Sequence, residues 1–161
     1  MKKGEKAVLA GIAAVVLGAM AMRAMDMGHR ERADEEIPFY SDASPEIRQA
    51  GGRVYSKYQC KRCHSLWTVR DIMQSVPAPA LDGIGSLRDA QWLERYLSAT
   101  NPQSILPSRL KKEYRMPSYH DMPEEERRVL VAYLASLKVK DWYLEETRRA
   151  ECVKLTGGEG C

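Results

Sequence analysis

The sequence is poor in the residues that most often carry chemistry, with four cysteines and three histidines among 161 residues. Its net charge is only +3, and it has no block of Lys and Arg long enough to bind phosphates, so nucleic acid is not an expected partner. Runs with strand periodicity and internal repeats are both lacking, which favours an all-α fold that is small and rich in loops. Since 44% of the residues are hydrophobic, a globular core remains feasible.

The N-terminal region combines a basic start with an uncharged run. Residues 7–22, "AVLAGIAAVVLGAMAM", follow three lysines, Lys2, Lys3 and Lys6. This run is longer than the apolar core of a typical signal peptide, so we expect residues 1–27 to form an uncleaved transmembrane anchor, with a cleaved signal helix as the alternative. In both cases the lysines stay in the cytoplasm and the remainder is exported. We therefore expect a domain that faces the bacterial periplasm, anchored to the inner membrane or, after cleavage, secreted into the periplasm.

The remainder of the chain divides into three predicted segments: a linker (28–44), a helical domain (45–137) and a C-terminal tail (138–161). We expect the first helix of the domain to begin at Ser44-Pro45 and to run toward Tyr58. Serine is a favourable N-cap residue, and proline suits the first helical position.

Two more helices are expected in the domain, and a further helical stretch in the tail. Apolar residues at helical spacing predict a helix over residues 87–99. An acidic first turn predicts another helix that starts at Pro123. The intervening residues 101–123 contain four prolines and are predicted to form a loop.

Three of the rare residues stand together in "QCKRCHSLW", residues 59–67: Cys60, Cys63 and His64. A Cys-x-x-Cys pair can bind zinc, form a redox disulfide or add to the two vinyl groups of a haem. Zinc needs about four ligands, and the other two cysteines are remote in the sequence. A thioredoxin-like site needs a βαβ context, which this sequence lacks. The spacing therefore predicts one covalent haem c, with thioethers from both cysteines and with His64 as an iron ligand.

Several short motifs follow one another in the sequence: "GGRVY" (51–55), "CKRCH" (60–64), "PAL" (79–81), "RMPSY" (115–119) and "LVAYL" (130–134). With them, residues 48–137 resemble the class I c-type cytochromes, the monohaem class of mitochondrial cytochrome c, here of a membrane-anchored bacterial type. The resemblance implies that a glycine of the first motif meets Leu130 and Tyr133 at a close helix crossing. It also implies that the Pro79 carbonyl accepts the Nδ1–H of His64 and that Met116 is the distal iron ligand.

Met116 has three rivals as the distal ligand: Met73, His120 and Met122. We favour Met116 because it lies in a loop bounded by prolines, and proline rigidity lowers the entropy cost of holding a thioether on iron. His120 is the main alternative, since imidazole binds ferric iron more strongly. Met122 lies next to the predicted third helix, and Met73 precedes the Pro79 segment.

Iron held by His and Met has no open coordination site, so the chain is predicted to be an electron carrier and not an enzyme. Leu81 and Trp92 are expected to contact the cofactor, where apolar packing raises the reduction potential. We expect the carrier to link a quinol-oxidising complex to a terminal reductase or oxidase. The alternatives are a fixed cytochrome subunit of a larger membrane complex, of the nitric oxide reductase or quinol-oxidising type, and a haem sensor or peroxidase.

Two further expectations concern the charges and the remaining cysteines. Residues 46–115 carry twelve Lys/Arg against six Asp/Glu, which predicts a basic face for docking to an acidic redox partner. Cys152 and Cys161 are predicted to form a disulfide, because they are the two cysteines left over in an oxidising compartment. The alternatives are two independent thiols in a frayed tail, or one cysteine bonded to a partner.

Overall fold

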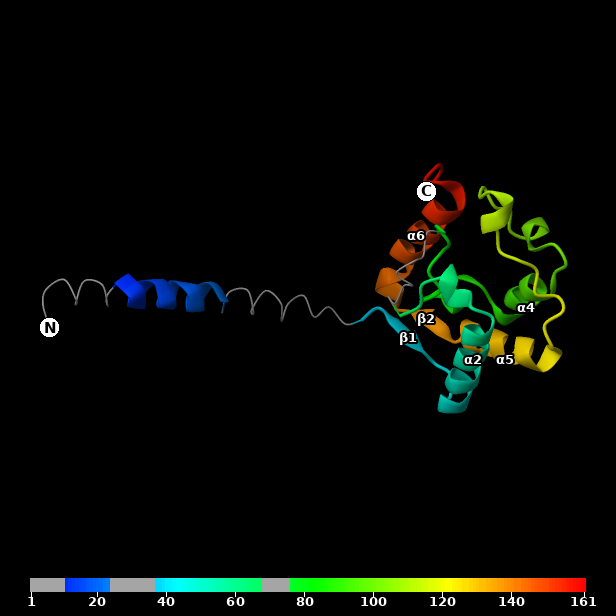
Figure 1. Cartoon of the computed structure of the whole chain (residues 1–161), viewed down its shortest axis with the longest axis horizontal. Helices are drawn as coiled ribbons and strands as arrows, with labels where there is room; N and C mark the ends of the chain where they lie inside the picture. Colours follow the sequence, from blue (N-terminus) through cyan, green and yellow to red (C-terminus); the bar gives the residue numbers. More distant parts are fainter. Residues whose placement is uncertain (1–10, 24–36, 68–75) are drawn as a thin grey trace, which may run out of the picture. The chain divides into compact units, whose positions relative to one another are not determined.

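The computed structural model (Figure 1) describes residues 11–23, 37–67 and 76–161 of the chain. The chain divides into two compact units, Met1–Ile37 and Pro38–Cys161, which are described separately. In the first unit, residues 11–23 form a helix whose residues are all exposed. No helix within the described ranges is long and apolar enough to cross a membrane. The predicted anchor, residues 1–27, extends beyond this helix into residues outside the described ranges, and it stays a prediction.

The second unit is mostly helical (Figure 1). Its helices are α2 (Pro45–Lys57), α3 (Ile84–Leu87), α4 (Ala90–Ser98), α5 (Glu124–Ala135) and α6 (Leu144–Thr156). Short 3-10 turns connect them: η1 (Cys60–Arg62), η2 (Pro102–Ser104), η3 (Lys112–Tyr114) and η4 (Asp141–Tyr143). Two short strands complete the described part of the unit, β1 (Phe39–Ser41) and β2 (Leu137–Val139).

Helices α2 and α5 begin where the sequence predicts. The Ser44 hydroxyl caps α2 by accepting a hydrogen bond from the Ile47 N–H at 3.4 Å, and Pro45 occupies the first turn. α5 follows Pro123 and carries three glutamates in its first turn, where the helix dipole favours negative charge. Both predictions are confirmed.

The helix predicted over residues 87–99 is divided into two. α3 ends at Leu87, Arg88 is extended (φ −136°, ψ 136°), and α4 begins after Asp89. The Asp89 carboxylate caps α4 by accepting a hydrogen bond from the Trp92 N–H at 2.6 Å. An N-cap residue is itself not helical, so Asp89 interrupts the helix that the apolar spacing alone predicts.

A small sheet corrects the all-α expectation. β1 pairs antiparallel with β2 in the register Phe39↔Val139, Tyr40↔Lys138 and Ser41↔Leu137. The Ser41 and Ser136 hydroxyls, 2.9 Å apart, extend this contact by a hydrogen bond. β1 lies within the segment predicted as a linker, 28–44, of which residues 28–36 lie outside the described ranges. Strands of three residues are too short to show alternation in the sequence.

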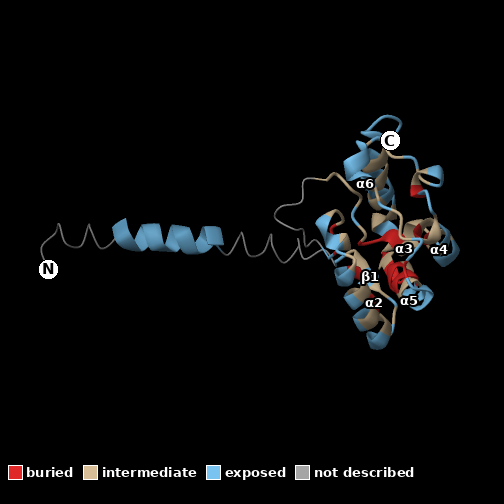
Figure 2. Ribbon diagram, turned by 45° about the vertical axis from the view of Figure 1, so that its right-hand side comes forward, coloured by how far each residue is buried: buried red, intermediate tan, exposed pale blue. Residues whose placement is uncertain are grey.

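The core forms where α2 crosses α5 and where α4 packs against α5. Buried residues gather along α5 and next to α3 (Figure 2). Leu130 of α5 and Leu137 of β2 are the largest fully buried side chains. Because α2 ends directly before the Cys-x-x-Cys-His motif, the crossing of α2 with α5 sets the position of that motif.

Candidate functional site

The Cys-x-x-Cys-His motif forms a tight turn after α2. Gln59 adopts a left-handed conformation (φ 55°, ψ 31°) that changes the direction of the chain and leads into η1. Within the turn, the His64 N–H donates a hydrogen bond to the Cys60 carbonyl at 2.9 Å. The turn brings Cys60, Cys63 and His64 to the wall of one cavity.

The His64 ring is oriented by a backbone carbonyl. Its Nδ1 lies 2.8 Å from the Pro79 carbonyl oxygen. Because a carbonyl only accepts, Nδ1 carries the proton and Nε2 keeps its lone pair. Burial lowers the pKa of His64, and the hydrogen bond to Pro79 opposes this only in part. The Tyr55 hydroxyl also donates to the His64 carbonyl at 2.9 Å. The result is a positioned, neutral imidazole, which is the form that ligates iron.

The cavity has a volume of about 640 Å³, within the roughly 300–1,000 Å³ range of small-molecule and cofactor sites. The site residues predicted from the sequence all line it: Cys60, Cys63, His64, Pro79, Leu81, Trp92 and Met116. The wall thus combines two thiols, an imidazole and a thioether with apolar side chains. These are the groups that a covalently attached haem requires, so the residues present fit this cofactor.

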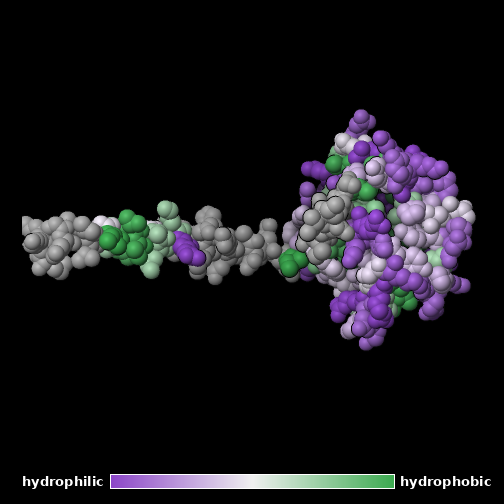
Figure 3. All heavy atoms as spheres, viewed as in Figure 1, coloured by the Kyte–Doolittle hydropathy of each residue, from purple (hydrophilic) through white to green (hydrophobic). Residues whose placement is uncertain are grey.

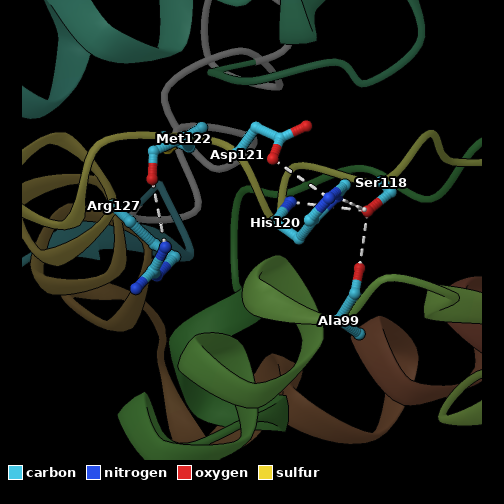
Figure 4. A network of polar contacts seen from close by, with 6 residues as sticks. All are labelled: Ala99, Ser118, His120, Asp121, Met122 and Arg127. Atoms are coloured by element: carbon cyan, nitrogen blue, oxygen red, sulfur yellow. Dashed lines mark hydrogen bonds and ion pairs between the residues drawn. The ribbon is translucent and has the colours of Figure 1, made fainter.

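Met116 reaches the cavity from the loop between η3 and α5. The Gln103 side-chain amide donates to the Met116 carbonyl at 3.0 Å. The Ser118 hydroxyl donates to the Ala99 carbonyl at 2.7 Å (Figure 4). Both contacts attach the loop to the segment that follows α4, so polar contacts as well as prolines hold Met116 in place.

The rivals to Met116 lie in other environments. Nδ1 of His120 is 2.9 Å from the Ser118 hydroxyl, and its Nε2 is 3.0 Å from the Asp121 carboxylate (Figure 4). Met122 is only 5% exposed and belongs to the hydrophobic core. Neither His120 nor Met122 lines the cavity, and Met73 lies outside the described residues.

Helix α4 supplies an aromatic wall of the cavity. Trp92 and Tyr96 both line it, and their rings stack with centroids 4.9 Å apart and an interplanar angle of 15°. The Arg88 guanidinium lies 5.1 Å from the centroid of the Trp92 ring. Solvent access and the local dielectric constant around a haem are among the properties that set its reduction potential. The two rings limit the access of water to this wall and lower the dielectric constant beside it.

The Cys60 thiol has the properties of an attachment residue and not those of a redox nucleophile. Burial raises the pKa of Cys60 to about 11, whereas a catalytic Cys-x-x-Cys nucleophile has a lowered pKa. Within the part of the chain that the structure describes, no three His, Cys, Asp or Glu side chains cluster as metal ligands. The redox-disulfide and zinc alternatives therefore gain no support from the structure.

The C-terminal tail contributes to the cavity wall in a way that the sequence does not predict. Glu151, Lys154 and Leu155 of α6 line the cavity. Because α6 contains no buried residue, no apolar stripe in its sequence signals this contact. The predicted disulfide is confirmed, since the structure joins Cys152 to Cys161 at the end of this helix.

Comparison with known families agrees with this geometry. The model of the cytochrome c family matches residues 49–138, which is more than half of the 161-residue chain. Comparisons with curated proteins and with solved structures found no match. The matched region contains the Cys-x-x-Cys-His turn and Met116, and its cofactor is a covalent haem c. The chain therefore belongs to the cytochrome c family, whose members transfer electrons.

Proposed function

We propose that the protein is a periplasmic one-electron carrier in which His64 and Met116 would hold the iron of the haem. The observation that carries this proposal is that both residues line one cavity, with the His64 Nδ1–H already donated to Pro79. Attached to Cys60 and Cys63, the haem supplies a one-electron iron couple. Iron held by both His64 and Met116 would have no open site for a substrate, so the chain would carry electrons without catalysing a reaction itself.

The residues around the two ligands favour electron transfer over ligand exchange. The Pro79 carbonyl fixes the tautomer of His64 and raises the basicity of its Nε2. The Gln103 contact holds the Met116 backbone, so little rearrangement accompanies a change of charge on the iron. Leu81 and Trp92 add apolar surface to the cavity wall.

A basic surface beside the cavity is the proposed docking site for an acidic redox partner. Arg62, Arg109 and Arg115 line the cavity and are exposed, and hydrophilic residues cover much of the face shown in Figure 3. Lys57 contributes less, because its ammonium lies 2.6 Å from the Glu126 carboxylate. Such a surface speeds association with an acidic partner, and salt screens the effect.

The N-terminal residues 1–27 are the proposed membrane anchor, with the haem domain in the periplasm. The helix at residues 11–23 exposes mostly hydrophobic side chains (Figure 3), and three lysines precede it. The Cys152–Cys161 disulfide fits an oxidising compartment. In that position the carrier would accept electrons from a quinol-oxidising complex and donate them to a terminal reductase or oxidase.

The test is purification of the full chain from native membranes in detergent, followed by potentiometric titration. A carrier is recovered alone, shows one one-electron transition, and binds no carbon monoxide when reduced. Recovery in a fixed ratio with other subunits would replace the mobile carrier by a subunit of a larger complex. Stoichiometric binding of carbon monoxide would indicate an open iron site, as in a sensor or peroxidase, and would overturn the proposal.

A further inference from the structure

The C-terminal extension lies beyond the cytochrome c match, which ends at residue 138, yet it forms part of the haem cavity. Glu151 and Lys154 of α6 line the cavity. Two hydrogen bonds from arginine side chains help to attach α6 to the rest of the domain. The Arg88 guanidinium donates to the Glu151 carboxylate at 3.0 Å, and the Nε–H of Arg109 donates to the Lys154 carbonyl at 3.4 Å.

The charge of Glu151 is already balanced within the protein by that of Arg88. The Arg88 and Glu151 side chains are only 23% and 13% exposed, so the ion pair is largely removed from water. Burial raises the pKa of Glu151, and the Arg88 guanidinium opposes this shift. The pair therefore ties α6 to the segment before α4, and the Glu151 carboxylate does not neutralise the other cations of the wall.

Arg109 and Lys154 line the same cavity wall, but they differ from Arg88 in having no carboxylate partner among the described residues. They come from distant parts of the sequence, and Arg109 also approaches the end of α6, where a Cβ on Gly157 would lie 3.6 Å from its Cζ. Within the described ranges neither side chain has a carboxylate partner. Two further charged side chains line the cavity, those of Arg115 and Glu113, and both are exposed. Cations that line one cavity wall favour an anion bound between them.

We propose that Arg109 and Lys154 bind one propionate of the haem, so that the C-terminal extension completes the cofactor site. This inference rests on the haem assignment made above. A propionate is the anion that a haem brings into its cavity, and a carboxylate withdrawn from water needs cationic hydrogen-bond donors. The Lys154 carbonyl accepts only the Nε–H of Arg109, which leaves both Nη groups of Arg109 for the carboxylate.

The two cations have a measurable consequence for the reduction potential. Nearby positive charge lowers the pKa of a carboxyl group by about 1–3 units, so the propionate stays ionised at neutral pH. A group that is ionised in both redox states binds no proton on reduction. The reduction potential of the wild-type protein is therefore independent of pH around neutrality.

The test measures the reduction potential of the holoprotein against pH in Arg109→Gln, Lys154→Gln and the double variant. Loss of the cations raises the pKa of the propionate, and reduction then takes up a proton. The potential falls as pH rises through this region, by up to about 59 mV per pH unit for a one-electron couple. Arg109→Lys keeps the charge and keeps the flat profile.

Matched controls separate this site from general surface charge. Lys111→Gln and Arg149→Gln remove the same charge from the same loop and the same helix, but neither residue lines the cavity. Both controls keep the flat profile. The proposal is overturned if the potentials of Arg109→Gln and Lys154→Gln stay independent of pH, as those of the controls do. It is also overturned if the effects of the two substitutions on the pH profile simply add in the double variant, as those of independent sites do. If the double variant loses haem, the pH profile of the Arg109→Gln potential decides the test by itself. Absence of covalent haem from the wild type would overturn the haem assignment instead.

Discussion

Gly51 of α2 lies directly against the side chain of Tyr133 in α5. A Cβ placed on Gly51 would be 2.2 Å from the Tyr133 Cβ and 2.5 Å from its Cγ, far inside van der Waals contact. The two helices can therefore cross at this distance only because position 51 has no side chain. The crossing orients the end of α2, from which the haem attachment turn continues.

The first prediction concerns this helix crossing. Gly51→Ala forces α2 away from Tyr133 and should destabilise the holoprotein by about 1–3 kcal/mol, as overpacked core sites do. The neighbouring Gly52 is the matched control, because a Cβ there meets nothing within 4 Å. Gly52→Ala should stabilise the protein by about 0.5–1 kcal/mol through helix propensity. Denaturant unfolding of both variants measures the difference, and equal effects of the two substitutions would contradict the packing argument.

The second prediction concerns covalent attachment. Cys60→Ser and Cys63→Ser each remove one of the two thiols that line the cavity, so each should greatly reduce the yield of holoprotein. Cys152→Ser is the control, because this cysteine belongs to the disulfide. Acid acetone should leave the haem on the wild-type protein, and haem that enters the organic phase would refute covalent attachment.

The third prediction concerns the distal ligand. Met116→Ala should abolish the weak near-infrared sulfur-to-iron band of the oxidised protein, lower the potential and open the reduced iron to carbon monoxide. Met122→Ala is the matched control. It removes a core methionine that does not line the cavity, so it should cost about 2–5 kcal/mol of stability and keep the band. Loss of the band in His120→Ala, with Met116→Ala unchanged, would assign the ligand to His120.

The fourth prediction concerns acid sensitivity. Glu126 of α5 accepts hydrogen bonds from Lys57 at 2.6 Å and from the Tyr58 hydroxyl at 2.8 Å. The bond from Lys57, followed by that from Tyr58, lowers the pKa of Glu126 from its ordinary value of 4.5. A lowered pKa in the folded state contributes stability above the unfolded-state pKa, and this contribution is lost as pH falls through the folded-state pKa.

Thermal unfolding of the oxidised holoprotein between pH 7 and pH 3 measures this effect. Glu126→Gln should be less stable than the wild type at pH 7, and the gap should close as the wild-type carboxylate takes up its proton. Glu125→Gln is the control, since Glu125 pairs with Arg128 on the exposed surface of the same helix, and it should follow the wild type. A gap that stays constant with pH would show that the Glu126 charge is not responsible.

The fifth prediction concerns the tail. The Cys152–Cys161 disulfide closes a short loop at the end of α6, and the chain-entropy relation gives it about 2.5–3 kcal/mol of stabilisation. Unfolded, unreduced holoprotein should show no free thiol, because the other two cysteines are in thioethers. Two free thiols per chain would contradict the disulfide, while reduction of the native protein should lower its unfolding temperature.

Local signals in the sequence were sufficient for much of the helical fold. The Ser44-Pro45 cap predicts the start of α2, and the acidic first turn predicts α5, because caps and dipoles act within one helical turn. The paired strands could not be predicted, since each has three residues and their partners are remote in the sequence. Asp89 carried a usable signal, because aspartate is a strong N-cap residue, but the apolar spacing around it indicated a continuous helix.

The candidate site likewise has a part that the sequence predicts and a part that it does not. The attachment turn, the Pro79 carbonyl and the Met116 loop are marked by short motifs, so these parts of the cavity wall were predicted from the sequence, whereas wall residues such as Gln103 were not. Lys154 was not, because α6 meets the cavity through half-buried polar residues that form no hydrophobic pattern. Contacts of this kind depend on tertiary placement alone.

The position of α6 after the attachment motif also bears on the order in which the cavity wall is built. Because a chain is synthesised from its N-terminus, Cys60 and Cys63 emerge before Lys154. Until α6 has been made, the cavity lacks the part of its wall that Glu151, Lys154 and Leu155 provide. The attachment turn is therefore the first part of this wall to be synthesised, and α6 is the last.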